Sequence, residues 1–123
     1  FALAQAGVSF ISLSDIDQGK CEALSTRLKT QFPTLNVDIG STKGVHLDVV
    51  INATPLGMKG DDSLPFDPSE LPSTTLVADI VTKPEMTPLL SIAEKTGHRV
   101  HTGKYMHMGQ ARLAAKFLGF ESI

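Results

Sequence analysis

Residues 47–58 read Leu-Asp-Val-Val-Ile-Asn-Ala-Thr-Pro-Leu-Gly-Met, and this stretch decides the fold. Its first half is almost continuously apolar, which predicts a strand over 47–53 that is covered on both faces of a sheet. Asn52, Thr54 and Gly57, at and after the end of that strand, are typical of a tight turn. In an open α/β sheet, ligands bind at the carboxyl ends of the strands. The stretch therefore predicts small polar groups and exposed backbone at the place where a cofactor would lie.

Helices and strands are predicted to alternate along the rest of the chain. Apolar spacing and cap residues predict helices over residues 1–6, 18–32, 88–95 and 105–118. Short apolar runs predict strands over residues 8–14, 36–39, 47–53, 76–81 and 98–101. The connections are predicted to be a loop or helical turn at 41–45 and a long loop at 57–75 with one helical turn near 68–71. Strands separated by helices indicate an α/β fold with a doubly wound parallel sheet.

Composition sets limits on the class of protein. The chain has 123 residues, of which 41% are hydrophobic and 20% charged, as expected for one soluble globular domain. A net charge of −2 gives no electrostatic reason to bind nucleic acid or an anionic membrane surface. No apolar stretch approaches the ~20 residues that a membrane span needs. The single cysteine, Cys21, rules out an intrachain disulfide and favours a reducing compartment such as the cytoplasm.

The string VINATPLGM at residues 50–58 resembles the cofactor domain of shikimate dehydrogenases, including the quinate/shikimate and shikimate dehydrogenase-like branches. The resemblance covers nearly all of residues 1–123 and implies a single nicotinamide dinucleotide-binding domain of Rossmann type. Phe1 opens what looks like the middle of a helix, so we expect a fragment that lacks the first strand and the Gly-rich turn after it. The pyrophosphate of the cofactor would normally lie at that turn, and the chain alone is therefore expected to be inactive.

The resemblance also implies a reaction. Members of the family transfer hydride between NAD(P) and C3 of shikimate, quinate or a related cyclic polyhydroxy acid, and the cofactor supplies the hydride chemistry. The proton-handling Lys and Asp belong to a separate N-terminal substrate domain, so no catalytic residue is expected in this chain. The expected partners are a small polyhydroxy acid, the missing substrate domain and a second copy in a homodimer. The alternative from another class is a dinucleotide-binding or regulatory module without turnover.

Asp15 stands at the carboxyl end of the first predicted strand. In dinucleotide-binding domains an acidic residue at this place accepts hydrogen bonds from the adenosine ribose diol. Its carboxylate repels a 2′-phosphate, which predicts NAD as the cofactor, with NADP as the second choice. NADP-using shikimate dehydrogenases usually read Asn-Arg-Thr here, whereas this chain places Ile16 where that Arg would be and leaves Lys20 as a cation within reach. The alternative is that Asp15 or Asp17 caps the next helix, and the two roles can coexist.

The nicotinamide end of the cofactor is assigned from the resemblance. Asn52, Ala53 and Thr54 would line the cofactor cleft, and the alternative is that they form a plain turn. Ile80 follows Asp79 at the end of the predicted strand 76–81, and by position it matches a family residue that packs against the nicotinamide. The spacing of Gly103 and Met106 matches the first part of the family's Gly-x-x-Met-x-x-x-Gln pattern, which implies cofactor contacts for both.

Gln110 completes that pattern and is predicted to lie on a buried stripe of the closing helix with Met106, Leu113, Ala114, Phe117 and Leu118. A buried amide needs a partner, which is either a backbone group or a ligand. The resemblance implies a hydroxyl or carboxylate of the substrate. Thr82 replaces a substrate-contacting Tyr of shikimate enzymes and His107 replaces a Leu, which leaves a modified shikimate open as the substrate.

Two further patterns have weaker functional interpretations. His98 and His101, three residues apart on a short strand, point to opposite faces, and no metal site is expected. Gly57 and Gly60 suggest an anion-binding loop, but no suitable helix follows them. A mobile loop is the favoured interpretation of that segment.

Overall fold

The structure is a computed structural model that describes residues 1–40, 42 and 44–120. The chain divides into two compact units, Phe1–Val45 and His46–Ile123. The loop or helical turn predicted over 41–45 includes positions 41 and 43, which lie outside the described residues. Within the described residues, no helix combines the length and the apolar character that crossing a membrane requires.

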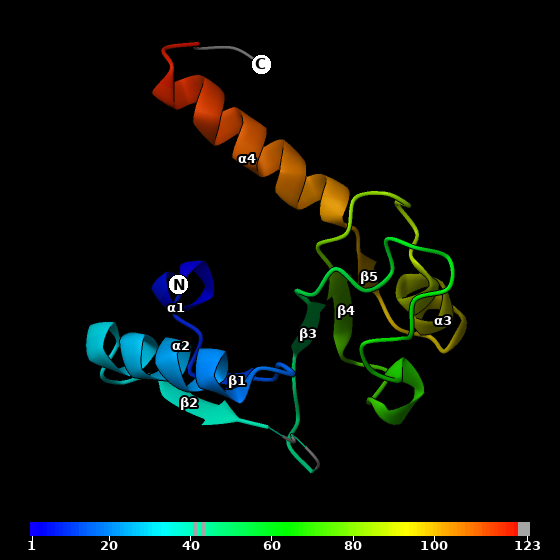
Figure 1. The fold of residues 1–123 in the computed structure, drawn as a ribbon, viewed down its shortest axis with the longest axis horizontal. Helices are drawn as coiled ribbons and strands as arrows, with labels where there is room; N and C mark the ends of the chain where they lie inside the picture. The colour runs from blue at the N-terminus through cyan, green and yellow to red at the C-terminus, as the bar shows by residue number, and fades with distance from the viewer. Residues whose placement is uncertain (41, 43, 121–123) are drawn as a thin grey trace. The chain divides into compact units, whose positions relative to one another are not determined.

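The first unit has an α-β-α-β order (Figure 1). Its elements are α1 (Ala2–Gln5), β1 (Phe10–Leu13), α2 (Gln18–Gln31) and β2 (Asn36–Ile39). The two strands pair in parallel, with Phe10 opposite Asn36 and Leu13 opposite Ile39. Ala4, Leu28 and Leu35 form the buried core of this unit, and partly buried apolar side chains from both strands and α2 pack around them.

Helix α2 begins and ends where its local signals predict. Asp17 is the N-cap, and its carboxylate accepts a hydrogen bond from the backbone N–H of Lys20 at 3.2 Å. The helix ends at Gln31, two residues before Pro33. Its buried residues are Cys21, Ser25 and Leu28.

The second unit contains a three-stranded parallel sheet in the order β3-β4-β5. Its elements are β3 (Val49–Asn52), the 3₁₀ helix η1 (Pro68–Glu70), β4 (Leu76–Asp79), α3 (Pro88–Lys95), β5 (Val100–His101) and α4 (Gly103–Phe117). Helix α3 packs against β4 and β5 through a core of Val77, Leu89, Leu90 and Ala93. The prediction of an α/β fold with parallel strands is confirmed in both units.

The prediction that the strand over 47–53 is covered on both faces is wrong. Strand β3 spans Val49–Asn52, and its Val49 and Ile51 side chains remain 44% and 40% exposed. Side chains on the opposite face of the strand are more buried, and Asn52 is 2% exposed. An apolar run shows which residues favour a strand, but the covering of each face depends on elements elsewhere in the protein.

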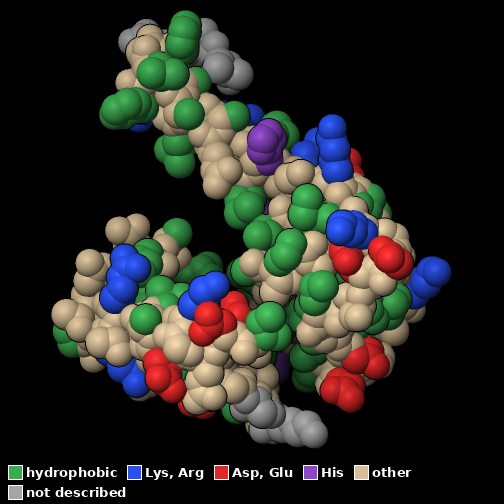
Figure 2. Space-filling view, viewed as in Figure 1, with side chains coloured by type: hydrophobic (Ala, Val, Ile, Leu, Met, Phe, Trp, Pro, Cys, Tyr) green, Lys and Arg blue, Asp and Glu red, His purple; other side chains and the backbone are tan. Residues whose placement is uncertain are grey.

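The buried stripe predicted for the closing helix is also wrong. Helix α4 runs away from the sheet of its unit in Figure 1, and hydrophobic side chains lie along its surface in Figure 2. Leu113 is 71% exposed and Phe117 is 90% exposed. Gln110 is exposed as well, so water can pair its amide and burial does not require a protein or ligand partner. Helical periodicity identifies residues that share a face, but it does not identify what that face packs against.

Candidate functional site

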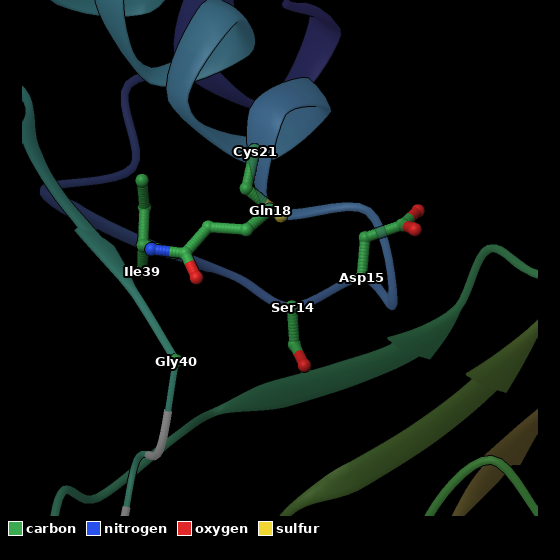
Figure 3. A pocket seen from close by; sticks show the side chains of 6 residues that line it. All are labelled: Ser14, Asp15, Gln18, Cys21, Ile39 and Gly40. Atoms are coloured by element: carbon green, nitrogen blue, oxygen red, sulfur yellow. The ribbon is translucent and has the colours of Figure 1, made fainter.

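A pocket of about 230 Å³ lies at the carboxyl ends of β1 and β2 (Figure 3). The end of β2 and the residues that follow the two strands form one part of its wall, and the first turn of α2 forms the other. We call it the Asp15 pocket, lined by Ser14, Asp15, Gln18, Cys21, Ile39 and Gly40. The parallel order of β1 and β2 brings both strand ends to the same edge, which is where ligands bind in open α/β sheets.

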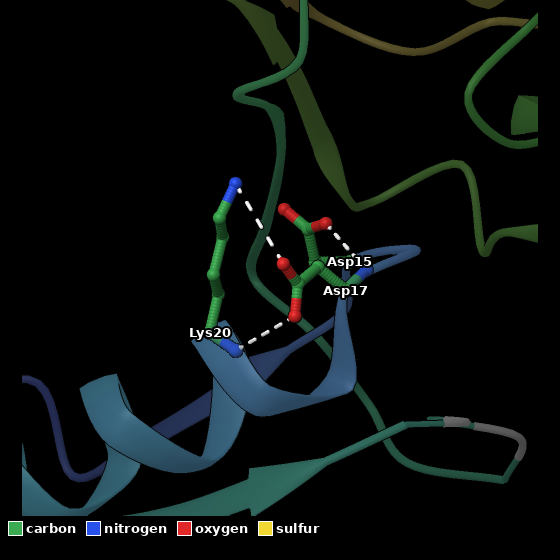
Figure 4. A network of polar contacts seen from close by, with 3 residues as sticks. All are labelled: Asp15, Asp17 and Lys20. Atoms are coloured by element: carbon green, nitrogen blue, oxygen red, sulfur yellow. Dashed lines mark hydrogen bonds and ion pairs between the residues drawn. The ribbon is translucent and has the colours of Figure 1, made fainter.

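The Asp15 carboxylate is exposed and has one hydrogen bond among the described residues (Figure 4). Its Oδ1 accepts from the backbone N–H of Asp17 at 2.8 Å, whereas Oδ2 has no such bond. Asp17, not Asp15, caps α2. Helix capping and ligand binding can therefore be assigned to different residues of this acidic pair. Asp17 is the cap, and one oxygen of Asp15 remains available to a ligand.

The cation near Asp15 is held by a neighbour. Lys20 Nζ lies 3.8 Å from Asp17 Oδ2, and both side chains are largely exposed. Ile16 projects fully into solvent. A surface pair of this kind is weak, typically ~0–1 kcal/mol. It nevertheless means that Lys20 already has an anionic partner at the N-cap of its own helix.

The turn after β3 is organised by the side chain of Asn52. The Asn52 Oδ1 accepts from the backbone N–H of Thr54 at 3.1 Å and from its hydroxyl at 2.7 Å. The Asn52 Nδ2 donates to the carbonyl of Leu56 at 2.9 Å. Asn52 is 2% exposed, whereas Ala53 is exposed and Thr54 is half-buried. The structure thus uses the Asn52 amide to shape the turn, and it leaves Ala53 and Thr54 at the surface.

A buried carboxylate that the sequence analysis missed lies next to this turn. Asp79, the last residue of β4, is 3% exposed. Its Oδ1 accepts from Asn52 Nδ2 at 3.1 Å and from the backbone N–H of Val81 at 2.9 Å, and its Oδ2 accepts from the Thr87 hydroxyl at 2.8 Å. We call these four residues the Asp79 network. An acidic residue at the end of an otherwise apolar strand was the signal that could have revealed it.

The structure brings two of the predicted site residues together. Gly103, the first residue of α4, is buried, and a Cβ added to it would lie 2.5 Å from the backbone oxygens of both Ile80 and Val81. Only glycine permits this close approach of α4 to the end of β4. Thr102, the N-cap of α4, carries a buried hydroxyl that has no hydrogen-bond partner among the described residues.

The other predicted residues of this region are exposed. Met106 is 42% exposed, one turn along α4 from Gly103, and Gln110 is exposed one further turn along. Thr82 is also exposed, two residues after the half-buried Ile80. Thr82 follows β4, and Met106 and Gln110 lie on α4, which starts near the same end of the sheet. The polar groups of Thr82 and Gln110 are accessible to a ligand.

The glycine-rich segment after the turn is occupied by the chain's own carboxylate. Asp62 Oδ2 accepts from the backbone N–H groups of Gly57 and Lys59, each at 2.9 Å. These hydrogen bonds, that from Lys59 first, hold the pKa of Asp62 below its ordinary value. The donors that could have bound an external anion are therefore used within the loop.

The histidines serve separate structural contacts. His98 is buried, and its Nδ1 and Nε2 lie 3.0 Å and 2.9 Å from the carbonyl oxygens of Thr75 and Pro68. This ring ties η1 to the start of β4. His101 stacks on Tyr105 with ring centroids 5.1 Å apart. Within residues 1–40, 42 and 44–120, no three His, Cys, Asp or Glu side chains gather in a way that could hold a metal ion.

Comparison with known proteins adds the following relationships. The chain is 34% identical to a shikimate dehydrogenase (NADP(+)) of Arthrobacter sp. (strain FB24), over 99% of this chain and 44% of that protein. The structure of quinate dehydrogenase from Corynebacterium glutamicum in complex with NAD matches with a TM-score of 0.78 at 30% identity, over 89% of this chain and 41% of that one.

A third match concerns the fold alone. The ligand-free 5-ketofructose reductase of Gluconobacter sp. strain CHM43 gives a TM-score of 0.86 at 23% identity, over 99% of this chain and 46% of that one. No protein-family model matches the chain. The chain therefore spans less than half the length of the relatives it matches.

Proposed function

The chain belongs to the shikimate/quinate dehydrogenase family, and we propose that it is the dinucleotide-binding part of an oxidoreductase. The parent enzyme would transfer hydride between NAD(P) and C3 of shikimate, quinate or a related cyclic polyhydroxy acid. The observation that carries this proposal is the Asp15 pocket at the carboxyl ends of two parallel strands, in a chain that matches a shikimate dehydrogenase over 99% of its length.

We assign the adenosine ribose to the Asp15 pocket and expect NAD to be preferred. Oδ2 of Asp15 is available to accept from the ribose diol, and the same carboxylate repels a 2′-phosphate. Ile16 offers no charge to a phosphate, and Lys20 already lies beside Asp17. The relatives differ in their cofactor, because the Arthrobacter protein is a shikimate dehydrogenase (NADP(+)) and the Corynebacterium quinate dehydrogenase is in complex with NAD.

We assign the nicotinamide end to the second unit. Ala53 and Thr54 would contact the cofactor from the turn that Asn52 shapes, while Ile80 and Gly103 would face the nicotinamide where α4 meets the end of β4. Met106 extends this surface along α4. Thr82 and Gln110, both exposed, would be the substrate-binding groups. NAD(P) would supply the hydride chemistry, and these residues would bind and orient it.

We also propose that the parent contains a substrate domain and a further strand with a Gly-rich turn, which would complete a sheet of Rossmann type. Strand β1 pairs only with β2, and β3 pairs only with β4, among the described residues. The exposed Val49, Ile51, Leu113 and Phe117 provide apolar surface for such parts to cover. A longer chain should therefore bind dinucleotide at least tenfold more tightly than residues 1–123 alone, and equal affinity would contradict this.

The test of the proposed function uses the intact parent protein. Oxidation of shikimate and of quinate is followed with NAD and with NADP, and dinucleotide binding is measured separately by calorimetry. Turnover of either acid supports the enzyme. Binding of dinucleotide without turnover of any cyclic polyhydroxy acid supports the alternative of a regulatory module.

A further inference from the structure

We propose that Asp79 is a positioning residue, which holds the loops after β3 and β4 in the arrangement that the nicotinamide half of the cofactor requires. This inference rests on the proposed function, because it concerns residues assigned there to cofactor binding. Asp79 itself is buried and touches neither reactant. Its role would be exerted through the three residues that donate hydrogen bonds to it.

The carboxylate is stabilised by hydrogen bonds and not by a cation. None of the ion pairs formed by the described residues involves Asp79. A carboxylate that is 3% exposed needs strong donors, since burial without partners is very unfavourable. Its three donors come from three different segments: the end of β3, the residues after β4 and the N-cap of α3. One side chain therefore links all three.

The first link sets the turn after β3. Asn52 Nδ2 faces two acceptors, Asp79 Oδ1 and the carbonyl of Leu56, and this fixes which end of the amide is nitrogen. The Asn52 Oδ1 must then face Thr54, from which it accepts two hydrogen bonds. The Thr54 hydroxyl in turn accepts from the backbone N–H of Leu56 at 3.2 Å. The orientation of the whole turn thus follows from the position of the Asp79 carboxylate.

The second link sets the start of α4. The bond from Val81 N to Asp79 Oδ1 bends the chain immediately after β4 and fixes the carbonyls of Ile80 and Val81. Those two carbonyls are the atoms against which Gly103 packs. The direction in which α4 leaves the sheet, and with it the position of Met106, therefore depends on the bend at Asp79.

The third link anchors the other two to the core. The Thr87 hydroxyl donates a hydrogen bond to Asp79 Oδ2 and accepts one from Leu90 N at 3.3 Å. Thr87 is therefore both a donor to the carboxylate and the N-cap of α3. A Cβ added at Gly57 would lie 3.5 Å from Thr87 Cβ, so the end of the turn rests against the same side chain. Thr87 is fully buried, which makes this a rigid anchor.

Two substitutions in the intact parent test the role. Asp79→Asn keeps the volume but turns an acceptor toward Thr87 into a donor, which leaves the Thr87 hydroxyl hydrogen without its partner. Thr87→Val removes that hydroxyl, and Thr87→Ser restores it. We expect Asp79→Asn and Thr87→Val to raise the Kd for dinucleotide about tenfold or more, and Thr87→Ser to restore it to within about threefold of wild type.

Leu89→Ala is the matched control, because Leu89 is a buried residue of the same helix outside the Asp79 network. It should lower the melting temperature at least as much as Thr87→Val and leave the Kd of the folded protein within about twofold. If the network variants lose no more affinity than Leu89→Ala, the inference is overturned and Asp79 is merely structural. If Asp79→Asn fails to fold, the Thr87→Val and Thr87→Ser pair still decides between the two outcomes.

The result for the wild-type parent separates the inference from the proposed function. A wild-type protein that binds neither NAD nor NADP overturns the proposed function, and the inference with it. A wild-type protein that binds dinucleotide, with network variants that bind equally well, overturns the inference alone.

Discussion

Asp15 and Asp79 both lie at the carboxyl end of a parallel strand, yet they differ in burial and in the number of hydrogen bonds that they accept. Asp79 is 3% exposed and accepts three hydrogen bonds from three segments of its unit. Asp15 is exposed and accepts a single bond, from Asp17 N. The position at a strand end is therefore insufficient to assign a role to a carboxylate. Burial and the number of protein donors separate a group that organises the protein from one that is available to a ligand.

The largest expected effect contrasts the two carboxylates directly. Asp79→Ala leaves the Val81 N–H and the Thr87 hydroxyl without their acceptor, and should lower the free energy of unfolding by about 3 kcal/mol. Asp15→Ala should change it by less than about 0.5 kcal/mol, because one exposed bond is lost to water. Urea unfolding of the intact parent measures both. Equal losses in the two variants would break the comparison.

Gln110→Ala sharpens the comparison at an exposed residue of the second unit, which also contains Asp79. Gln110 is exposed, so its loss should leave the melting temperature unchanged. If it binds substrate as proposed, kcat/KM should fall by roughly 5- to 150-fold, as expected for a lost hydrogen bond of ~1–3 kcal/mol, with dinucleotide affinity retained. An unchanged kcat/KM would remove Gln110 from the site.

Gly103→Ala probes the packing at the end of β4, where Asp79 fixes the bend. Its Cβ would meet two backbone oxygens at 2.5 Å, so either α4 or the bend must shift, at a cost of about 1–3 kcal/mol. Gly109→Ala is the matched control in the same helix, since nothing lies within 4 Å of its added Cβ. That change should be neutral or should stabilise by up to ~1 kcal/mol. Equal melting temperatures for the two variants would contradict the close approach.

Much of the fold was predictable because its signals are local. Asp17 caps α2, which was one of the two interpretations of the acidic pair, and α3 and β2 span the predicted residues Pro88–Lys95 and Asn36–Ile39. The errors concern what lies against an element, as with the exposed Val49 on β3 and the exposed face of α4. Those outcomes depend on surfaces distant in the sequence, or outside the chain, and no local pattern contains them.

The candidate site likewise combines residues that a local pattern predicts with a residue whose partners are distant in the sequence. Asp15 was predicted from its place after a strand and lines a pocket, and Gly103 was predicted from the family's Gly-x-x-Met-x-x-x-Gln spacing and packs against Ile80; their contacts with a cofactor stay predictions. Asp79 was missed because its side-chain partners, Asn52 and Thr87, are 27 and 8 residues away. Its importance appears only when the two loops are brought together, which requires the folded sheet.

Asp15→Asn in the intact parent tests whether the exposed carboxylate of the comparison sets the preference between NAD and NADP. Removing the negative charge removes the repulsion of a 2′-phosphate, while the side chain retains an oxygen that can accept from Asp17 N. We expect the ratio of kcat/KM with NAD to kcat/KM with NADP to fall about tenfold, and stability to change little. A wild-type preference for NADP of about tenfold or more would contradict the assignment of Asp15 itself.

Asp62 is intermediate between Asp79 and Asp15, and its protonation should have the smallest effect of the changes considered. It lies in an exposed loop, yet it accepts from Gly57 N and Lys59 N as Asp79 accepts from its donors. These bonds hold its pKa below the ordinary value of 3.8. A carboxyl with a lowered folded-state pKa stabilises its loop above the unfolded value and loses that contribution as pH falls through the folded one. The loop should therefore be fully anchored at neutral pH and released only in acid, below pH 3.8.

The backbone amides of Gly57 and Lys59 report this transition directly. Their NMR shifts should stay constant from neutral pH down to about 4 and then move together as Asp62 takes up a proton. Asp62→Asn should remove the step, because an amide does not titrate in this range. Asp67, whose pKa is lowered by Ser69, gives a second local transition in the same sample as an internal control. If the NMR shifts of the Gly57 and Lys59 amides stay constant as the pH falls, accepting several hydrogen bonds does not by itself allow a carboxylate to organise the backbone around it. The difference between Asp79 and Asp15 would then lie in their burial.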